Sequence, residues 1–195
     1  YYECSYKGHK AIPGKYSFNL KAGEMQVSSS AEILPNPLYS TDLATYTAYH
    51  QVMQQMENEF IQMHELVNTI YAKREQMAQL LANLPNDAKF KTIHTAGAAM
   101  IDKMKAWDED MVQRKSKAYD DVENFPNKFT ADYVFLINQT ESDLPSVNQP
   151  SLDLKKVLDL EWAKLKARAM EILETDIPSM NKQLFALGIG GVWKQ

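Results

Sequence analysis

The sequence is poor in the features that mark disulfide-bonded, membrane-spanning and nucleic-acid-binding proteins. Its 195 residues include one cysteine, so no disulfide can form within the chain. No apolar run approaches the roughly 20 residues that a membrane-spanning helix needs. The formal net charge of −4 gives no indication of binding to nucleic acid or to an anionic membrane. Seven glycines are few for a Rossmann fold, a β-sandwich or a propeller.

The composition that remains is typical of a helical protein with a buried core. Hydrophobic residues make up 45% and charged residues 24% of the chain, which argues against global disorder. Ten methionines, together with many Gln, Leu, Ala and Lys residues, favour helices. The chain begins Tyr1-Tyr2-Glu3-Cys4, which is typical of the middle of a domain. We therefore expect a fragment of a longer protein, whose own signal peptide the fragment would not contain.

Residues 1–38 predict β structure. Tyr16, Phe18 and Leu20 alternate with polar residues, Ala22-Gly23 offers a turn, and the alternation returns through residues 27–33. This pattern indicates a hairpin, and an isolated hairpin is only marginally stable in water. We expect residues 1–38 to be the remnant of an immunoglobulin-like β domain that ends at Pro35-Asn36-Pro37.

The segment from Thr41 to Leu84 contains neither glycine nor proline and predicts one very long helix, about 65 Å in length. Ser40 or Thr41 is the expected N-cap. Arg74 is the one charged residue in a series that otherwise carries large apolar side chains at 3-4 spacing: Tyr46, Tyr49, Met53, Met56, Phe60, Met63, Val67, Ile70, Met77, Leu81 and Leu84. An adjoining row of Val52, Leu66 and Leu80 makes the apolar stripe wider than a two-stranded coiled coil requires, which favours a bundle.

Three further helices and a short last one are expected. Residues 90–111 repeat the 3-4 spacing after the turn at Pro85-Asn86-Asp87, where Asp87 would cap the second helix. A loop through Pro126 precedes helices at 129–140 and 151–173, and Asp176 would cap a last helix that ends at Gly188. The predicted fold is mainly α, an antiparallel bundle of three to four helices over residues 39–195, preceded by the hairpin.

Two histidine patterns invite a metal-binding interpretation. His64-Glu65 resembles the start of a zinc-protease helix motif, but Asn68 stands where that motif has its second histidine. His50 and His64 lie fourteen residues apart, roughly 21 Å along a helix, which is too far to share a metal. We predict that both rings pack at the boundary of the stripe and that the chain has no metal ligand.

Two acidic runs, 108–110 and 120–123, could supply paired carboxylates for glycosidic chemistry or for calcium. A calcium loop needs a turn glycine and a distal glutamate, which are absent, so solvated faces are the expected role. Cys4 has no associated catalytic set, and the glycine-rich residues 188–191 follow no strand and cradle no phosphate. Asn138-Gln139-Thr140 matches a glycosylation acceptor. The Met-rich stripe could be a peptide groove, although core is the favoured interpretation. We assign no catalytic, cofactor-binding or metal residue.

Three stretches resemble a known family. They are Tyr1-Tyr2-Glu3 through 14–20 (Gly-Lys-Tyr-Ser-Phe-Asn-Leu), the exit 34–39 (Leu-Pro-Asn-Pro-Leu-Tyr), and the C-terminal 176–182 (Asp-Ile-Pro-Ser-Met-Asn-Lys) with 188–190 (Gly-Ile-Gly). They are similar to the C-terminal region of bacterial sortilin-like, BNR-repeat β-propeller proteins, often named glycosyl hydrolases or exo-sialidase-like proteins. The resemblance implies propellers, an immunoglobulin-like domain and a helical tail, in that order, in an exported protein. The sialidase-type repeat itself does not occur here.

From these patterns we expect a non-catalytic structural or interaction module, with the upstream propeller domains of the same chain as partner. An extracytoplasmic location follows from the resemblance alone. We expect a monomer or a weak dimer, with no nucleic acid, no membrane span and no cofactor. Two alternatives remain: an accessory part of a glycoside hydrolase whose active site lies in the propellers, and a self-associating coiled coil.

Overall fold

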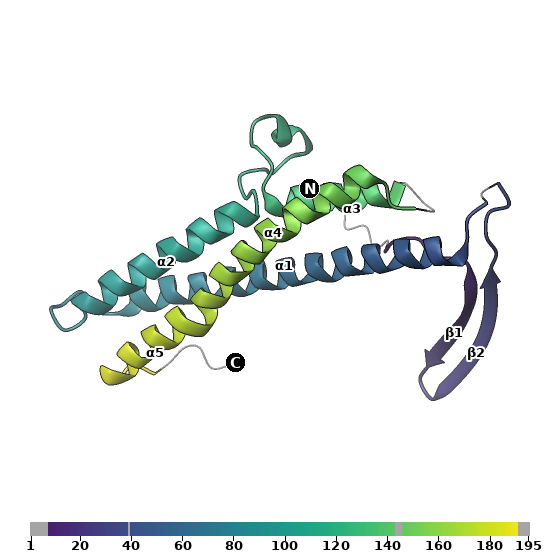
Figure 1. The fold of residues 1–195 in the computed structure, drawn as a ribbon. Coiled ribbons are helices and arrows are strands. Elements are labelled where there is room, and N and C mark those ends of the chain that lie inside the picture. Colours follow the sequence, from purple (N-terminus) through teal and green to yellow (C-terminus); the bar gives the residue numbers. More distant parts are fainter. Residues whose placement is uncertain (1–7, 39, 143–145, 191–195) are drawn as a thin grey trace.

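The protein is a helical bundle with an N-terminal β-hairpin, as the sequence predicts. The computed structural model describes residues 8–38, 40–142 and 146–190. The hairpin consists of β1 (Gly14–Ala22) and β2 (Met25–Ile33), and the longest helix is α1 (Leu43–Asn83). The other helices are α2 (Lys91–Met111), α3 (Phe129–Ser142), α4 (Gln149–Glu171) and α5 (Ile177–Ala186). Figure 1 shows α1 as the axis on which α2, α3 and α4 pack.

α1 forms one uninterrupted helix of 41 residues, roughly 60 Å long. Its N-cap is Asp42, whose Oδ1 accepts a hydrogen bond of 2.8 Å from the backbone N–H of Thr45. The prediction of Ser40 or Thr41 was therefore wrong by one or two residues. Most of the predicted stripe is buried: Tyr46, Tyr49, Met53, Met56, Met63, Val67, Ile70, Met77 and Leu80. The stripe is thus core, not an open peptide groove.

α2 returns antiparallel along α1, as the short turn predicts (Figure 1). Asp87 does not cap it, because α2 begins four residues later and its N-cap Phe90 makes no side-chain bond. Asp87 instead stabilises the turn by accepting from the backbone N–H of Lys89 at 2.8 Å. Gly97 faces the side chain of Leu81, and a Cβ there would lie 2.8 Å from both Leu81 δ-carbons. The glycine therefore lets the two helices approach closely.

α4 and α5 form one continuous helical run that crosses the bundle. α4 begins at the N-cap Asn148, whose Oδ1 accepts from the Ser151 N–H at 2.7 Å. Residues Ile172–Asp176 form a π-helical turn between α4 and α5. Pro178 accounts for this turn, because a proline has no N–H and its ring collides with the carbonyl four residues earlier. Asp176 is helical and caps nothing, contrary to prediction.

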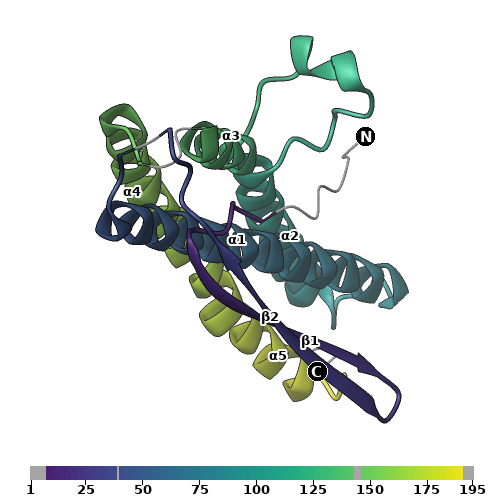
Figure 2. The same ribbon diagram turned by 90° about the vertical axis from the view of Figure 1, so that its right-hand side faces the viewer.

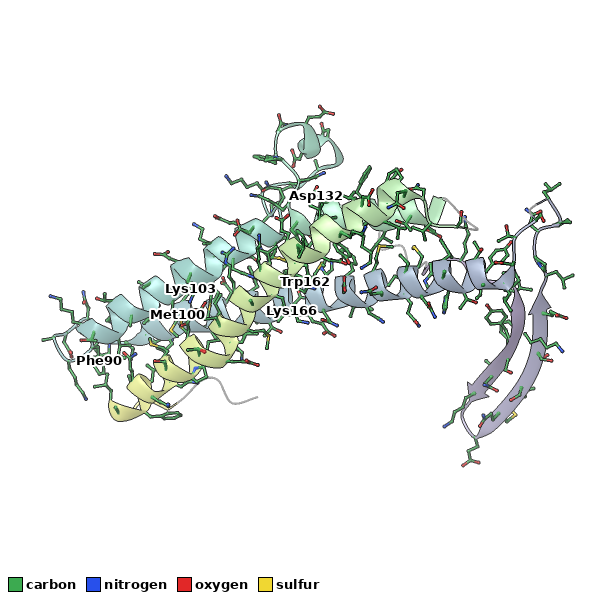
Figure 3. All side chains as sticks on the ribbon, in the orientation of Figure 1. Phe90, Met100, Lys103, Asp132, Trp162 and Lys166 are labelled. Carbon is green, nitrogen blue, oxygen red and sulfur yellow. The ribbon has the colours of Figure 1, made fainter. Side chains whose placement is uncertain are left out.

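The core lies where α1, α2, α3 and α4 face one another. Trp107 of α2 is fully buried, and its Nε1–H donates to the Leu165 carbonyl of α4 at 2.8 Å. Trp162 lies on the part of α4 that crosses the bundle and stacks 6.1 Å from Phe129 of α3 (Figure 3). Leu154 of α4 is 38% exposed, whereas Trp162 and Leu165 farther along the helix are buried. These contacts join α4 to α2 and to α3, and α1 packs against all three helices.

The connection between α2 and α3 was predicted as an irregular loop through Pro126. It contains a 3-10 turn at Tyr119–Glu123. The backbone N–H groups of Lys117 and Ala118, just before the turn, donate to the carboxylate of Asp121 at 2.5 and 2.9 Å. These bonds lower the pKa of Asp121. The loop projects from the bundle beside α3 (Figure 1).

Candidate functional site

The hairpin is the part of the molecule with the largest contrast between its two faces. The strands pair antiparallel from Gly14 opposite Ile33 to Ala22 opposite Met25, joined by Gly23-Glu24. Gly23 has φ +61°, which suits the first position of a type II′ turn. Residues opposite one another share a face, so one face carries Tyr16, Phe18, Leu20, Ala22, Met25, Val27, Ser29, Ala31 and Ile33. The other carries Lys15, Ser17, Asn19, Lys21, Gln26, Ser28, Ser30 and Glu32.

The apolar face of the hairpin is exposed. Phe18, Leu20, Met25 and Val27 are 60–72% exposed. Within the described residues, neither strand contributes a side chain to the core of the bundle. Figure 1 shows the hairpin beyond the N-terminal end of α1 with its strands clear of the helices, and in the turned view of Figure 2 it lies in front of them. The sheet has only two strands, so both outer edges also lack strand partners among the described residues.

A short segment before β1 attaches the hairpin to α1. The His9 backbone N–H and its ring Nδ1 each lie 2.7 Å from a carboxylate oxygen of Glu57. The His9 Nε2 lies 2.6 Å from Nδ1 of His50. Ile12 packs against the core, and its carbonyl accepts from the Tyr16 hydroxyl at 2.6 Å. The hairpin is thus held on both sides, by this segment and by the start of α1.

The two histidines of α1 lie in different surroundings. His50 bonds to His9, and the His64 ring packs edge-on against Phe60 with centroids 4.5 Å apart. Loss of water around the imidazole lowers the pKa of His64. Across the described ranges, no group of three or more His, Cys, Asp or Glu side chains could hold a metal ion.

The acidic run at 108–110 separates into three environments. Asp108 is 1% exposed and accepts two hydrogen bonds from Arg114, at 2.5 and 2.6 Å. Glu109 is exposed, and Asp110 pairs with Arg168 of α4 at 2.7 Å. Asp120 and Glu123 lie on the loop and are exposed. The expected solvated face is correct for Glu109, Asp120 and Glu123 but wrong for Asp108.

A buried polar network that the sequence did not indicate joins α1, α3 and α4. Tyr133 is fully buried, and its hydroxyl donates to Glu59 and lies 3.3 Å from Asp159. Lys155, also buried, donates to Asp159 at 2.6 Å. Burial, reinforced by the bond to Glu59, raises the pKa of Tyr133. The i,i+4 spacing of Lys155 and Asp159 was the available signal, although that spacing usually marks an exposed pair.

A second buried tyrosine has no such network. The Tyr49 hydroxyl is buried and has no hydrogen-bond partner among the described residues. Burial, with smaller contributions from Glu141 and Glu57, raises the pKa of Tyr49 to about 12. Both tyrosine side chains are therefore buried, but only the Tyr133 hydroxyl is hydrogen-bonded among the described residues.

The remaining sequence candidates do not form a site. Asn138 is exposed on α3, but the Thr140 hydroxyl is buried and donates to the Leu136 carbonyl at 2.8 Å. Gly188 follows α5 with φ +75°, and its N–H donates to the Phe185 carbonyl at 3.0 Å. Cys4 and Gly191 lie outside the described residues. No helix within the described ranges is long and apolar enough to span a membrane.

The chain was compared with protein-family models, curated proteins and solved structures. No model of a protein family, no curated protein and no solved structure matches the chain. The resemblance to sortilin-like propeller proteins therefore stays a prediction, as does the division into residues 1–38 and 39–195.

Proposed function

We propose that the chain is a non-catalytic structural or interaction module at the C-terminal end of a larger exported propeller protein. Its hairpin contributes two strands to an upstream β domain, and its helical bundle acts as a rigid spacer or docking body. The observation that carries this proposal is the exposed apolar face of the hairpin, which has a fully polar opposite face. Such a face is stable in a sheet that another layer covers.

A β-sheet of the same parent chain covers this apolar face of the hairpin in the proposed arrangement. The two strands offer free backbone edges for pairing, and a hairpin of this size is marginal in water by itself. The attachment through His9 and Glu57 supports the same role, because it fixes the base of the hairpin on the bundle. A propeller and immunoglobulin-like parent is what the sequence resemblance implies.

Hydrogen exchange tests the proposal. The full-length parent and this 195-residue chain are compared, and the amides of residues 14–33 are expected to exchange much more slowly in the parent. The variant Leu20→Ser with Val27→Ser, which removes a cross-strand apolar pair, is expected to abolish that protection. The matched control Ser17→Ala with Ser30→Ala changes the facing pair on the polar side. Equal exchange in parent and fragment overturns the proposal.

Two further measurements decide between the proposal and its alternatives. Turnover of aryl-glycosides is compared for the parent with and without residues 41–195. A folded truncation that loses turnover would show that the module serves a glycosidase site, whereas unchanged turnover supports a non-catalytic role. Light scattering of the 195-residue chain tests self-association. A stable dimer that Leu20→Ser with Val27→Ser dissociates would assign the hairpin face to a second copy instead of a parent domain.

A further inference from the structure

A concave cationic surface lies where the end of α2 and the following loop meet α1. The pocket has a volume of about 430 Å³. Five basic and two acidic side chains line it, so it carries a positive surplus on a chain whose net charge is −4. It is unrelated to the hairpin, and the function proposed above does not require it.

Arg74 is the residue that interrupts the apolar stripe of α1, and it forms one wall of this pocket. Its side chain is 17% exposed, and Nη2 lies 3.0 Å from Glu75. Nη1 lies 3.8 Å from the buried carboxylate of Asp108. A charged residue in a core row normally destabilises a bundle, so its position here requires a compensating partner. Glu75 on α1 is the closer partner, and Asp108 contributes a more distant one from α2.

Arg114 is held against the same carboxylate in bidentate geometry. Its Nε and Nη2 lie 2.5 and 2.6 Å from the two oxygens of Asp108, which raises the pKa of Arg114. The guanidinium groups of Arg114 and Arg74 lie 4.4 and 4.6 Å from the centroid of the Tyr71 ring. Two guanidinium groups are thus fixed around a single buried carboxylate. Asp108 and Glu75 together balance the two guanidinium charges, so the positive surplus of the pocket comes from its lysines. Nη1 of Arg114 has no bonded acceptor within the described residues and is available as a donor.

The loop after α2 adds cations that are not paired. Lys115 and Lys128 line the pocket and form no ion pair with any described residue, and Lys105 lies a distant 3.9 Å from the exposed Glu109. Gln113 folds the loop into place, because its amide donates to the Pro126 carbonyl and accepts from the Lys115 N–H, both at 3.1 Å. Phe125 and Pro126 give the pocket an apolar wall.

We propose that this pocket binds a small, multiply charged oxyanion, phosphate or sulfate, either free or as an ester on a small molecule. The fixed guanidinium groups of Arg74 and Arg114 form the base, and the ammonium groups of Lys115 and Lys128 close on the anion from the rim. Guanidinium groups bind tetrahedral oxyanions through paired N–H donors, and ammonium groups add charge without fixed geometry. The net negative charge of the whole chain disfavours long polyanions such as nucleic acid.

Isothermal titration of the 195-residue chain at low ionic strength tests the proposal, with sodium phosphate, sodium sulfate and glucose 6-phosphate as probes and sodium chloride at matched ionic strength as reference. We expect saturable binding tighter than about 1 mM for at least one oxyanion. Saturation by glucose 6-phosphate alone would assign the site to an ester, and saturation by the inorganic ions would assign it to the free anion. No saturable binding of any probe overturns the proposal.

Charge variants show whether binding belongs to the pocket. Lys115→Gln with Lys128→Gln is expected to weaken binding at least about tenfold without changing the circular dichroism or the melting temperature, because both side chains lie outside the core. The matched control Lys21→Gln with Lys182→Gln removes the same charge from β1 and α5 and is expected to leave affinity unchanged. Equal weakening by both pairs would mean unspecific attraction and overturns the proposal. Arg74→Lys keeps the positive charge but loses the paired N–H donors of the guanidinium group, so it is expected to weaken binding as well.

Discussion

The hairpin and the bundle illustrate two outcomes of equally regular apolar patterning. In α1 the 3-4 pattern is buried almost completely, because α2, α3 and α4 cover it within the same chain. In β1 and β2 the alternation is as strict, yet Phe18, Leu20, Met25 and Val27 remain 60–72% exposed. Periodicity predicts which face of an element is apolar, but it does not show whether the covering surface belongs to the same chain.

The difference also predicts where the folding free energy is concentrated. Burial of an apolar side chain stabilises by about 1.5–3 kcal/mol, and exposed side chains contribute little of this. The bundle should therefore unfold as a cooperative unit, while the hairpin opens locally at low cost. Substitutions in the two regions test this contrast.

The largest effect is expected from Trp107→Ala. Trp107 is fully buried and donates a hydrogen bond from α2 to the Leu165 carbonyl of α4, so its truncation should cost about 3–5 kcal/mol of unfolding free energy in urea. Phe18→Ala, the control on the hairpin, should change the same quantity by less than about 0.5 kcal/mol. Comparable losses in both variants would contradict the contrast.

Within the bundle, two tyrosines give the next largest difference. Tyr133→Phe removes the hydroxyl that bonds to Glu59 and lies near Asp159, and should cost about 1–3 kcal/mol of unfolding free energy. Tyr49→Phe removes a buried hydroxyl without a partner among the described residues, so it should cost nothing or stabilise by up to about 1 kcal/mol. Thermal and urea unfolding measure both, and equal destabilisation would disprove the role of the network.

A smaller contribution to the unfolding free energy is expected from His64, and it should depend on pH. The folded pKa of His64 lies below its ordinary value of about 6.5, so the unfolded chain binds the proton first as pH falls. The contribution of neutral His64 is complete above about pH 6.5 and is lost as pH falls through the folded pKa. Urea unfolding at pH 7.5 and pH 5 should therefore show a smaller acid loss for His64→Gln than for the unaltered chain. An identical loss in both would contradict this.

The smallest effect on the bundle is expected from Gly23→Ala. Gly23 has φ +61°, and an L-residue in this region costs roughly 1 kcal/mol, so the hairpin should open more often. Hydrogen exchange of residues 14–33 should accelerate, whereas the melting temperature of the bundle should not change. The neighbouring Glu24→Ala serves as control. A lowered melting temperature in Gly23→Ala would mean that the two regions unfold together.

Several parts of the candidate site could be predicted from the sequence, and others could not. The alternation in residues 16–33 predicts both the hairpin and its apolar face. Arg74 was recognisable as an interruption of the stripe, but its neighbour Asp108 lies 34 positions away and was assigned to a solvated face. The link from His9 to Glu57 joins residues 48 positions apart. No local pattern encodes such pairs, because they depend on how the chain turns at residues 33–42 and 84–90.

The sequence by itself determined the elements: a hairpin, one very long helix, an antiparallel second helix and two more helices that complete the core. Local propensity and apolar spacing suffice for this, since each acts over a few neighbouring residues. The tertiary structure alone decided that the face of the helix is covered and the face of the hairpin is not. It also decided that Asp108, Arg114 and Arg74 converge, because burial and ion pairing depend on partners distant in the chain.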